Sequence, residues 1–192
     1  MFWGRRHVAK LNEDMITVDS VVQVISTPRK EYSEGPIFFK RKGIYYYLYT
    51  IGGDEKYQYA YVMSRVSPMG PFEAPEQDII STTNYERGIF GPGHGCVFHP
   101  EGTDNYYFAY LEFGRRSTNR QTYVNQLKFN EDGTIRPVEL TMDGVGALKK
   151  VKSDKKMKID TVYASSIEVP LKIEPMKLSL IHISEPTRLR RI

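Results

Sequence analysis

The chain has 192 residues, 40% of them hydrophobic and 12% aromatic, which is enough to build one domain around a buried core. Residues 1–148 carry 16 lysine and arginine residues against 18 aspartate and glutamate residues, so the net charge of +4 arises mainly from six lysines in residues 149–158 and from the C-terminal tail. This distribution argues against a nucleic-acid groove on the folded part, and the lack of an apolar run of about 18 residues argues against a transmembrane helix.

The first part of the sequence predicts short strands. Residues 1–4 have the composition of a strand end, and short strands are predicted at residues 8–11 and 15–18, with a longer one at 20–25. Because nothing precedes residues 1–4 that could pair with them, we expect the beginning of the fold to be missing.

The clearest pattern in the chain is a strand, a tight turn and a second strand. Residues 37–39 and 44–50 are β-branched and aromatic runs of strand length, separated by a charged turn that ends in Gly43. Residues 57–66 then alternate with a period of two, which is the signal of a further strand. A turn at residues 67–72, with two prolines and one glycine, ends this hairpin.

Glu34 lies just before the first strand of this pattern. Pro36 fixes its own φ and disfavours helical backbone at Gly35, so the peptide enters the sheet stiffly. With Tyr32 before it and Phe38 after it, the carboxyl group could sit in a partly apolar mouth and donate a proton. A solvated loop glutamate is the competing interpretation, and the chemistry of these residues alone favours it.

The second half of the chain predicts another set of strands after a mostly polar loop at residues 73–88. A Gly-Pro-Gly-His-Gly segment at residues 91–95 leads into a strand, and further strands are predicted at 106–113 and 121–129. The glycines around His94 would let the backbone approach a ligand or a tightly packed neighbour. An imidazole that is merely hydrogen-bonded to backbone is the alternative.

A repeated sequence predicts the architecture. Gly-Ile-Tyr-Tyr-Tyr-Leu-Tyr at residues 43–49 is echoed by Asp-Asn-Tyr-Tyr-Phe-Ala-Tyr at residues 104–110. A period of about 60 residues of short strands fits the blades of an all-β propeller better than a sandwich or a barrel, although any two tyrosine-rich strands look alike. Residues 1–150 would hold about two blades and part of another, fewer than the ~4 of a closed ring, so we expect an incomplete propeller.

The single cysteine and the two C-terminal segments complete the sequence. The single cysteine, Cys96, excludes an internal disulfide framework and is expected to be a buried structural thiol. Residues 151–177 predict a lysine-rich linker and the start of a downstream module. Residues 178–192 resemble the translation of a sequencing-library adapter and are expected to be a non-native tail, with a natural basic tail as the alternative.

Three segments together resemble glycoside hydrolase family 43. They are Glu34-Gly35-Pro36 with its hairpin, Gly91-Pro92-Gly93-His94-Gly95 before a strand, and residues 130–138 followed by Gly144-Val145-Gly146. The resemblance covers residues 1 to about 150 and implies the later blades of a five-bladed β-propeller, as a C-terminal part of the catalytic domain.

The resemblance implies an inverting glycosidase, of the α-L-arabinofuranosidase or β-xylosidase type, that acts on arabinose- or xylose-containing plant cell-wall polysaccharides or oligosaccharides. By motif match, Glu34 is the general acid. The family's general base and a second aspartate that orients the acid lie in earlier blades, and neither Asp14 nor Asp19 matches them. The chain alone is therefore expected to be inactive, and a non-catalytic carbohydrate-binding fragment is the alternative.

The resemblance also implies roles for three other residues. His94 would point into the central channel, near a structural calcium ion or a water molecule. Arg120 matches an arginine near the subsite for the non-reducing sugar, with a solvated charge run as the alternative. Phe38 could stack on a sugar ring, although core packing is the competing interpretation. A secreted or periplasmic location follows, with a carbohydrate partner and neither nucleic acid nor membrane.

Overall fold

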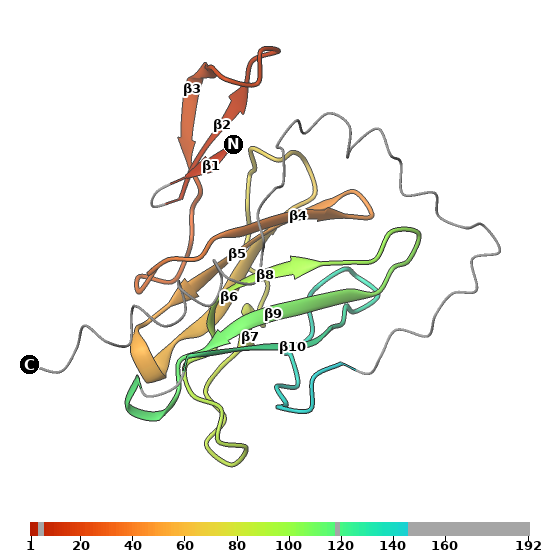
Figure 1. The fold of residues 1–192 in the computed structure, drawn as a ribbon. Helices are drawn as coiled ribbons and strands as arrows, with labels where there is room; N and C mark the ends of the chain where they lie inside the picture. Colours follow the sequence, from red (N-terminus) through yellow and green to blue (C-terminus); the bar gives the residue numbers. More distant parts are fainter. Residues whose placement is uncertain (4–5, 118–119, 146–192) are drawn as a thin grey trace, which may run out of the picture. The chain divides into compact units, whose positions relative to one another are not determined.

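The computed structural model describes residues 1–3, 6–117 and 120–145, all within the compact unit Met1–Ala147. These residues form ten strands in three antiparallel sheets and two short 3-10 helices (Figure 1). The expected linker at 151–177 and tail at 178–192 lie outside the described residues. Within the described part, no helix has the length and apolar character needed to cross a bilayer.

The first sheet has the strand order β1-β2-β3, with β1 at Phe2–Trp3, β2 at His7–Leu11 and β3 at Val18–Val24. The strand predicted at residues 15–18 is wrong, because Asp14 makes a turn there. Its Oδ1 accepts the backbone N–H groups of Ile16 and Thr17, each at 2.9 Å. A carboxylate that satisfies these donors locally competes with strand pairing, so β3 begins only at Val18.

The second sheet has the order β4-β5-β6-β7, with β4 at Ile37–Arg41, β5 at Ile44–Ile51, β6 at Gln58–Ser64 and β7 at Ile79–Ser81. The predicted hairpin is confirmed, with Ile37 paired opposite Leu48. Residues 73–88 are mostly loop, as predicted, but they also contain β7, which the sequence did not indicate. Three residues are too few to show a period of two.

The third sheet has the order β10-β9-β8, with β8 at Gly93–Phe98, β9 at Tyr106–Glu112 and β10 at Gln121–Leu127. The two copies of the tyrosine-rich repeat become β5 and β9, which are interior strands of their sheets and each the second strand in chain order. The repeat therefore marks equivalent positions in two sheets, as the blade hypothesis requires.

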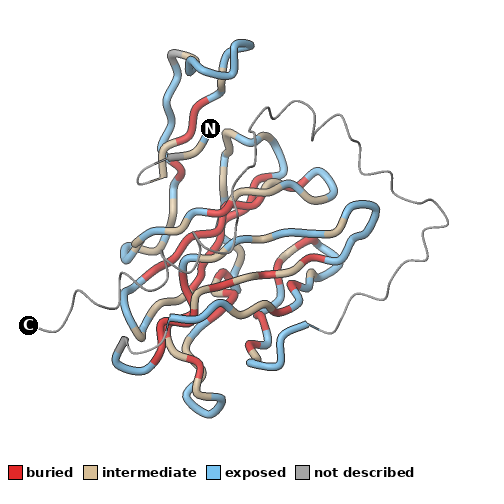
Figure 2. Tube along the Cα trace, viewed as in Figure 1, coloured by how far each residue is buried: buried red, intermediate tan, exposed pale blue. Residues whose placement is uncertain are grey.

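The second sheet is buried on both faces, because side chains of β5 pack against neighbours on each side of it. Tyr46 packs in a cluster with Phe108 of the third sheet, whereas Tyr47 and Tyr49 pack in a second cluster with Val8 of the first sheet. Alternate side chains of a strand point to opposite faces, so a strand of continuous aromatic and aliphatic residues suits this position. Buried residues follow one another along β5 and β6, shown red in Figure 2.

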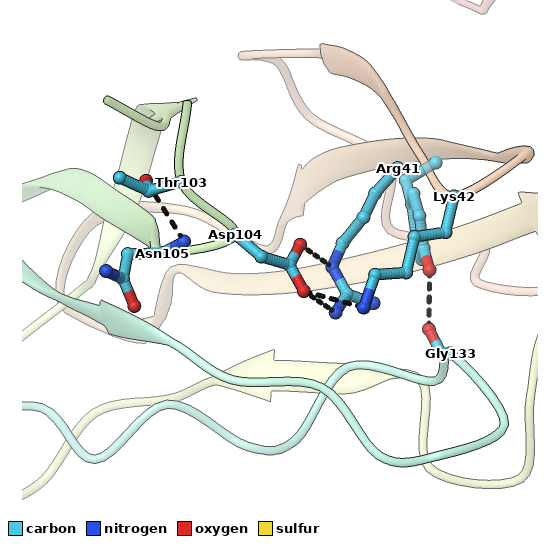
Figure 3. Close-up of polar contacts among 7 residues, drawn as sticks. Arg41, Lys42, Thr103, Asp104, Asn105 and Gly133 are labelled. Carbon is cyan, nitrogen blue, oxygen red and sulfur yellow. Dashed lines mark hydrogen bonds and ion pairs between the residues drawn. The ribbon is translucent and has the colours of Figure 1, made fainter. Parts of the chain in front are cut away.

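An ion pair joins the second and third sheets at the edge of the Tyr46 cluster, where Arg41 Cζ lies 4.1 Å from the centre of the Phe129 ring (Figure 3). Arg41 at the end of β4 donates through Nε and Nη2 to Asp104, at 2.9 and 2.6 Å, and Lys42 Nζ lies 2.8 Å from the same carboxylate. Nearby, the buried Tyr46 hydroxyl donates to the Gly133 carbonyl at 2.6 Å. These contacts connect segments about 60 to 90 residues apart and fix the two sheets against each other.

The Arg41–Asp104 pair makes a pH-dependent contribution to stability. The hydrogen bonds from Arg41 and then Lys42 lower the pKa of Asp104 from 3.8 to about 2. A lowered pKa in the folded state means that the contribution is complete above 3.8 and is lost as the pH falls through about 2. We expect Asp104→Asn to lower the melting temperature at pH 7 and to match the wild type near pH 2.

Melting temperatures across that pH range test the prediction, with Asp143→Asn as the control at another exposed aspartate. A deficit of Asp104→Asn that persists unchanged at pH 2 would show that the pair does not carry the effect.

Candidate active site

A cavity of about 540 Å³ brings together three of the four residues that the sequence predicted as site residues. Glu34, His94 and Arg120 all line it. The other lining residues come mainly from the third sheet: Tyr57, Gly95, Cys96, Ala109, Tyr110, Leu111 and Thr122. Residues about 60 and 25 positions apart in the chain therefore meet at one concave surface, the kind of place where ligands bind.

The backbone of Glu34 is held as an extension of the second sheet. Its carbonyl accepts the N–H of Thr50 on β5 at 2.9 Å. Gly35 follows with a φ of +60°, and a Cβ there would lie 2.9 Å from Tyr59 Oη and 3.0 Å from His94 Cα. Only glycine fits this conformation and this close approach, which explains the Glu-Gly-Pro sequence.

Two buried hydroxyl groups connect this segment to the Gly-His-Gly segment. The Tyr59 hydroxyl donates to the Gly35 carbonyl at 2.8 Å and accepts the Gly95 N–H at 2.6 Å. Thr50 Oγ1 accepts the His94 N–H at 3.2 Å. Burial raises the pKa of Tyr59 to about 12, so the hydroxyl keeps its proton at neutral pH. The acid and the histidine are thus placed by buried partners from one sheet.

A β-bulge turns His94 toward the cavity. The pairing of β8 with β9 shifts between Gly93 and Cys96, so that one extra residue lies on β8. His94 has a φ of +36°, which is unusual for a residue with a side chain. Bulges of this kind redirect a side chain next to a functional site.

The Glu34 carboxyl group has two partners in the cavity. The Tyr57 hydroxyl donates to Oε1 at 3.0 Å, and His94 Nδ1 lies 3.5 Å from Oε2. The Glu34 and His94 side chains remain 45% and 61% exposed, so a ligand can reach both. Burial, and then the hydrogen bond to the Glu34 carboxylate, raise the pKa of Tyr57. An accessible carboxyl group held on one side can act as an acid or a base.

Arg120 stands at the same cavity, just before β10. Its guanidinium carbon lies 4.9 Å from the centre of the Phe113 ring, a cation–π contact. The Phe113 ring in turn meets the Tyr57 ring edge-on, with 5.9 Å between their centres. Arg120 lines the cavity, and its planar guanidinium could donate hydrogen bonds to the hydroxyl groups of a ligand there.

Phe38 does not line the cavity. It stacks on Phe2 with ring centres 4.1 Å apart and is partly buried in the cluster of Tyr47 and Tyr49. Tyr32 likewise stacks on Tyr49, at 5.6 Å. Tyr32 and Phe38 therefore do not form the partly apolar mouth that the sequence left open. Both rings pack toward the first sheet, and Tyr57 lies beside Glu34.

For two further residues, the structure differs from what the sequence predicted. Cys96 is exposed and lines the cavity, so the expectation of a buried thiol is wrong; its side chain lies on the open face of β8. Tyr57 was predicted as the first residue of a strand and not as a site residue. It is one of 14 tyrosines, and nothing in its local sequence distinguishes it from those of the core.

The described residues do not by themselves suit a calcium ion. They include no group of three or more histidine, cysteine, aspartate or glutamate side chains that could hold a metal. Calcium takes six to eight oxygen ligands, whereas the one acidic neighbour of His94 in the cavity is Glu34. A calcium ion or water near His94 stays a prediction.

Comparison with known sequences gives one family. The sequence model of Glycosyl hydrolases family 43 matches residues 3–135. A β-D-galactofuranosidase (xynD) of Aspergillus niger is 40% identical over 151 residues, covering 74% of this chain and 42% of that protein. An arabinoxylan arabinofuranohydrolase of Paenibacillus polymyxa is 27% identical over 169 residues, covering 81% and 26%. The chain thus spans less than half the length of these relatives.

Comparison with solved structures gives the fold. A thermostable family-43 glycoside hydrolase aligns with a TM-score of 0.61 and 19% identity, over 73% of this chain and 48% of that one. A family 43 arabinoxylan arabinofuranohydrolase of Bacillus subtilis, solved with cellotetraose, gives 0.58 and 28%, over 73% and 30%. These alignments confirm the predicted all-β fold, an incomplete set of β-propeller blades.

Proposed function

The chain belongs to glycosyl hydrolase family 43, and we propose that it carries the proton-donating side of the active site of an inverting furanoside hydrolase. One observation supports this most: the Glu34 carboxyl group lies in an open cavity, with a hydroxyl donor at one oxygen and an imidazole beside the other. A carboxyl group so placed can protonate the oxygen of a glycosidic bond as it breaks.

Inverting hydrolysis needs a second carboxylate, about 6.5–9.5 Å from the acid, to activate a water molecule on the other face of the sugar. Glu34 is the one carboxylate among the described residues that line the cavity. We therefore propose that the general base comes from outside the described residues. Glu34 would give its proton to the leaving oxygen, and the water would lose its proton to that base.

His94 and Arg120 are proposed to bind the sugar. Both can donate hydrogen bonds to hydroxyl groups, and both line the cavity together with Glu34. Ala109 and Leu111 form an apolar part of the wall, against which the C–H face of a sugar ring could lie.

The names of the relatives narrow the substrate class. The two curated relatives are called a galactofuranosidase and an arabinofuranohydrolase, so both names specify a five-membered sugar ring. We propose that terminal galactofuranosyl or arabinofuranosyl groups are the substrates, in preference to xylopyranosides. Polysaccharides that carry such groups lie outside cells, which favours a secreted or periplasmic location.

A carbohydrate-binding module without catalysis is the second candidate. The observation that favours it is the same single carboxylate in the cavity. A propeller segment with Glu34, His94 and Arg120 could hold a sugar without a base to activate water.

A hybrid enzyme separates the two functions. In this hybrid, residues 1–145 of the chain replace the matching segment of the Aspergillus niger relative, so that the rest of the propeller is supplied. We expect the hybrid to hydrolyse 4-nitrophenyl galactofuranosides or arabinofuranosides at least 10-fold faster than the xylopyranoside, a difference of about 1.4 kcal/mol in transition-state binding. A folded hybrid that binds these sugars without releasing nitrophenol would favour the binding module.

A further inference from the structure

We propose that Tyr57 is a positioning residue for Glu34, which fixes the carboxyl group so that Oε2 is the oxygen that carries and delivers the proton. The proposal rests on the proposed function for its kinetic consequence only. Its structural part concerns the orientation of one side chain and can be tested without any substrate.

The hydrogen bond itself is the first observation. The Tyr57 hydroxyl donates to Glu34 Oε1 at 3.0 Å, a length at which an O–H···O bond is properly formed. A protonated carboxyl group carries one proton, on one of its two oxygens. With Oε1 engaged as an acceptor, the proton belongs on Oε2, which faces His94.

The Tyr57 ring is itself fixed on two sides. A Cβ at Gly93 would lie 3.0–3.1 Å from atoms of the Tyr57 side chain, so the ring packs directly against the backbone of β8. On the other side its ring meets Phe113 edge-on at 5.9 Å. A ring held between a strand backbone and a second ring presents its hydroxyl in one direction.

The loop that carries Tyr57 is set by the same glycine segment as His94. A Cβ at Gly91 would lie only 2.1 Å from the carbonyl oxygen of Asp54, in the short 3-10 helix Asp54–Lys56 that directly precedes Tyr57. Thr83 Oγ1 accepts the Gly91 N–H at 3.0 Å and donates to the Glu55 carbonyl at 2.5 Å. The Gly-Pro-Gly-His-Gly segment thus places both neighbours of the Glu34 carboxyl group.

The chemistry follows from this placement. When the glycosidic bond breaks, the proton leaves Oε2 for the departing oxygen, and Glu34 becomes a carboxylate. The Tyr57 hydroxyl then donates to a full negative charge, and such charge-assisted hydrogen bonds are about twice as strong as neutral ones. The contact therefore strengthens as the proton is transferred and would favour the transition state over the bound substrate.

The structural test uses the 192-residue chain with Tyr57→Phe, which keeps the ring and removes only the hydroxyl. Three-bond ¹³C couplings measured by NMR report the side-chain rotamers of Glu34. We expect one dominant rotamer in the wild type and averaging over at least two in the variant, with the melting temperature little changed. Tyr123→Phe, which removes a hydroxyl bonded to Gln121, is the control. An unchanged Glu34 rotamer in Tyr57→Phe overturns the proposal.

The kinetic test uses the hybrid enzyme. We expect Tyr57→Phe to lower kcat about 10- to 100-fold with KM unchanged, as loss of positioning for a reacting group does. In a hybrid that already carries Glu34→Gln, Tyr57→Phe should lower kcat no further, because the two residues act as a unit. A rise in KM alone would instead make Tyr57 a substrate contact. If Glu34→Gln has no effect on hydrolysis, the proposed function fails while the rotamer result stands by itself.

Discussion

Glu34→Gln in the hybrid enzyme is expected to lower kcat/KM for an oligosaccharide furanoside about 100- to 10,000-fold, the contribution typical of a positioned general acid. Glutamine has nearly the same shape as glutamate and can still accept the Tyr57 hydroxyl at its amide oxygen. It has no acidic proton to give to the leaving oxygen, which must then depart as an alkoxide. The loss therefore isolates proton donation from packing and from sugar binding.

The control for this variant is Glu101→Gln, at an exposed glutamate in the turn between β8 and β9. It removes the same charge but lies outside the lining of the cavity. We expect its rates to equal those of the parent hybrid. Equal losses in both variants would mean that net charge, and not a proton donor at position 34, explains the effect.

Gly95→Ala is expected to destabilise the chain by about 1–3 kcal/mol, the usual cost of forcing extra volume into a packed site. A Cβ at this position would lie 2.1 Å from the Ala109 carbonyl oxygen and 3.1 Å from Tyr110 Cα. Both atoms belong to the backbone of β9, which pairs with β8, so neither can move without disturbing the ladder. The hydrogen bond from the Gly95 N–H to Tyr59 would also be strained.

Gly53→Ala is the matched control for this second prediction. A Cβ at Gly53 meets nothing within 4 Å, and its backbone is extended, with a φ of −159°. Urea unfolding should place this variant within about 0.5 kcal/mol of the wild type, as for surface changes generally. If both alanine variants unfold at the same urea concentration as the wild type, the close approach of β8 to β9 is wrong.

Local signals explain the part of the fold that the sequence predicts. The hairpin of β4 and β5 is set by neighbouring residues: two apolar runs of strand length and a charged turn with Gly43 at its end. The repeat of β5 in β9 is visible for the same reason, because strand composition is a local property. These features needed no knowledge of the rest of the chain.

The sequence does not show which face of the second sheet meets the cavity. A period of two assigns Phe38 and Phe39 to opposite faces of β4, but it does not say which face meets the cavity. In a half-exposed sheet the polar face would decide this question. Here both faces are buried, so the sequence carries no such signal. It left sugar stacking and core packing both open for Phe38, which packs on Phe2.

Tyr57 illustrates a second limit. Its contact with Glu34 depends on three segments that meet only in the folded chain: the Glu-Gly-Pro turn, the 3-10 helix before β6 and the glycines of β8. The sequence indicated that the glycines around His94 allow a close approach, but not what approaches them. The structure identifies the partners as the Asp54 carbonyl, the Tyr57 ring and the backbone of β9.

The leaving-group dependence of Glu34→Gln tests the central claim most directly. A 2,4-dinitrophenolate departs without a proton, whereas a methoxide does not, so an acid matters only for the second. We predict that the hybrid with Glu34→Gln hydrolyses the dinitrophenyl furanoside nearly as fast as the parent but loses most of its activity on the methyl furanoside. The same fractional loss on both substrates would contradict a proton donor at position 34.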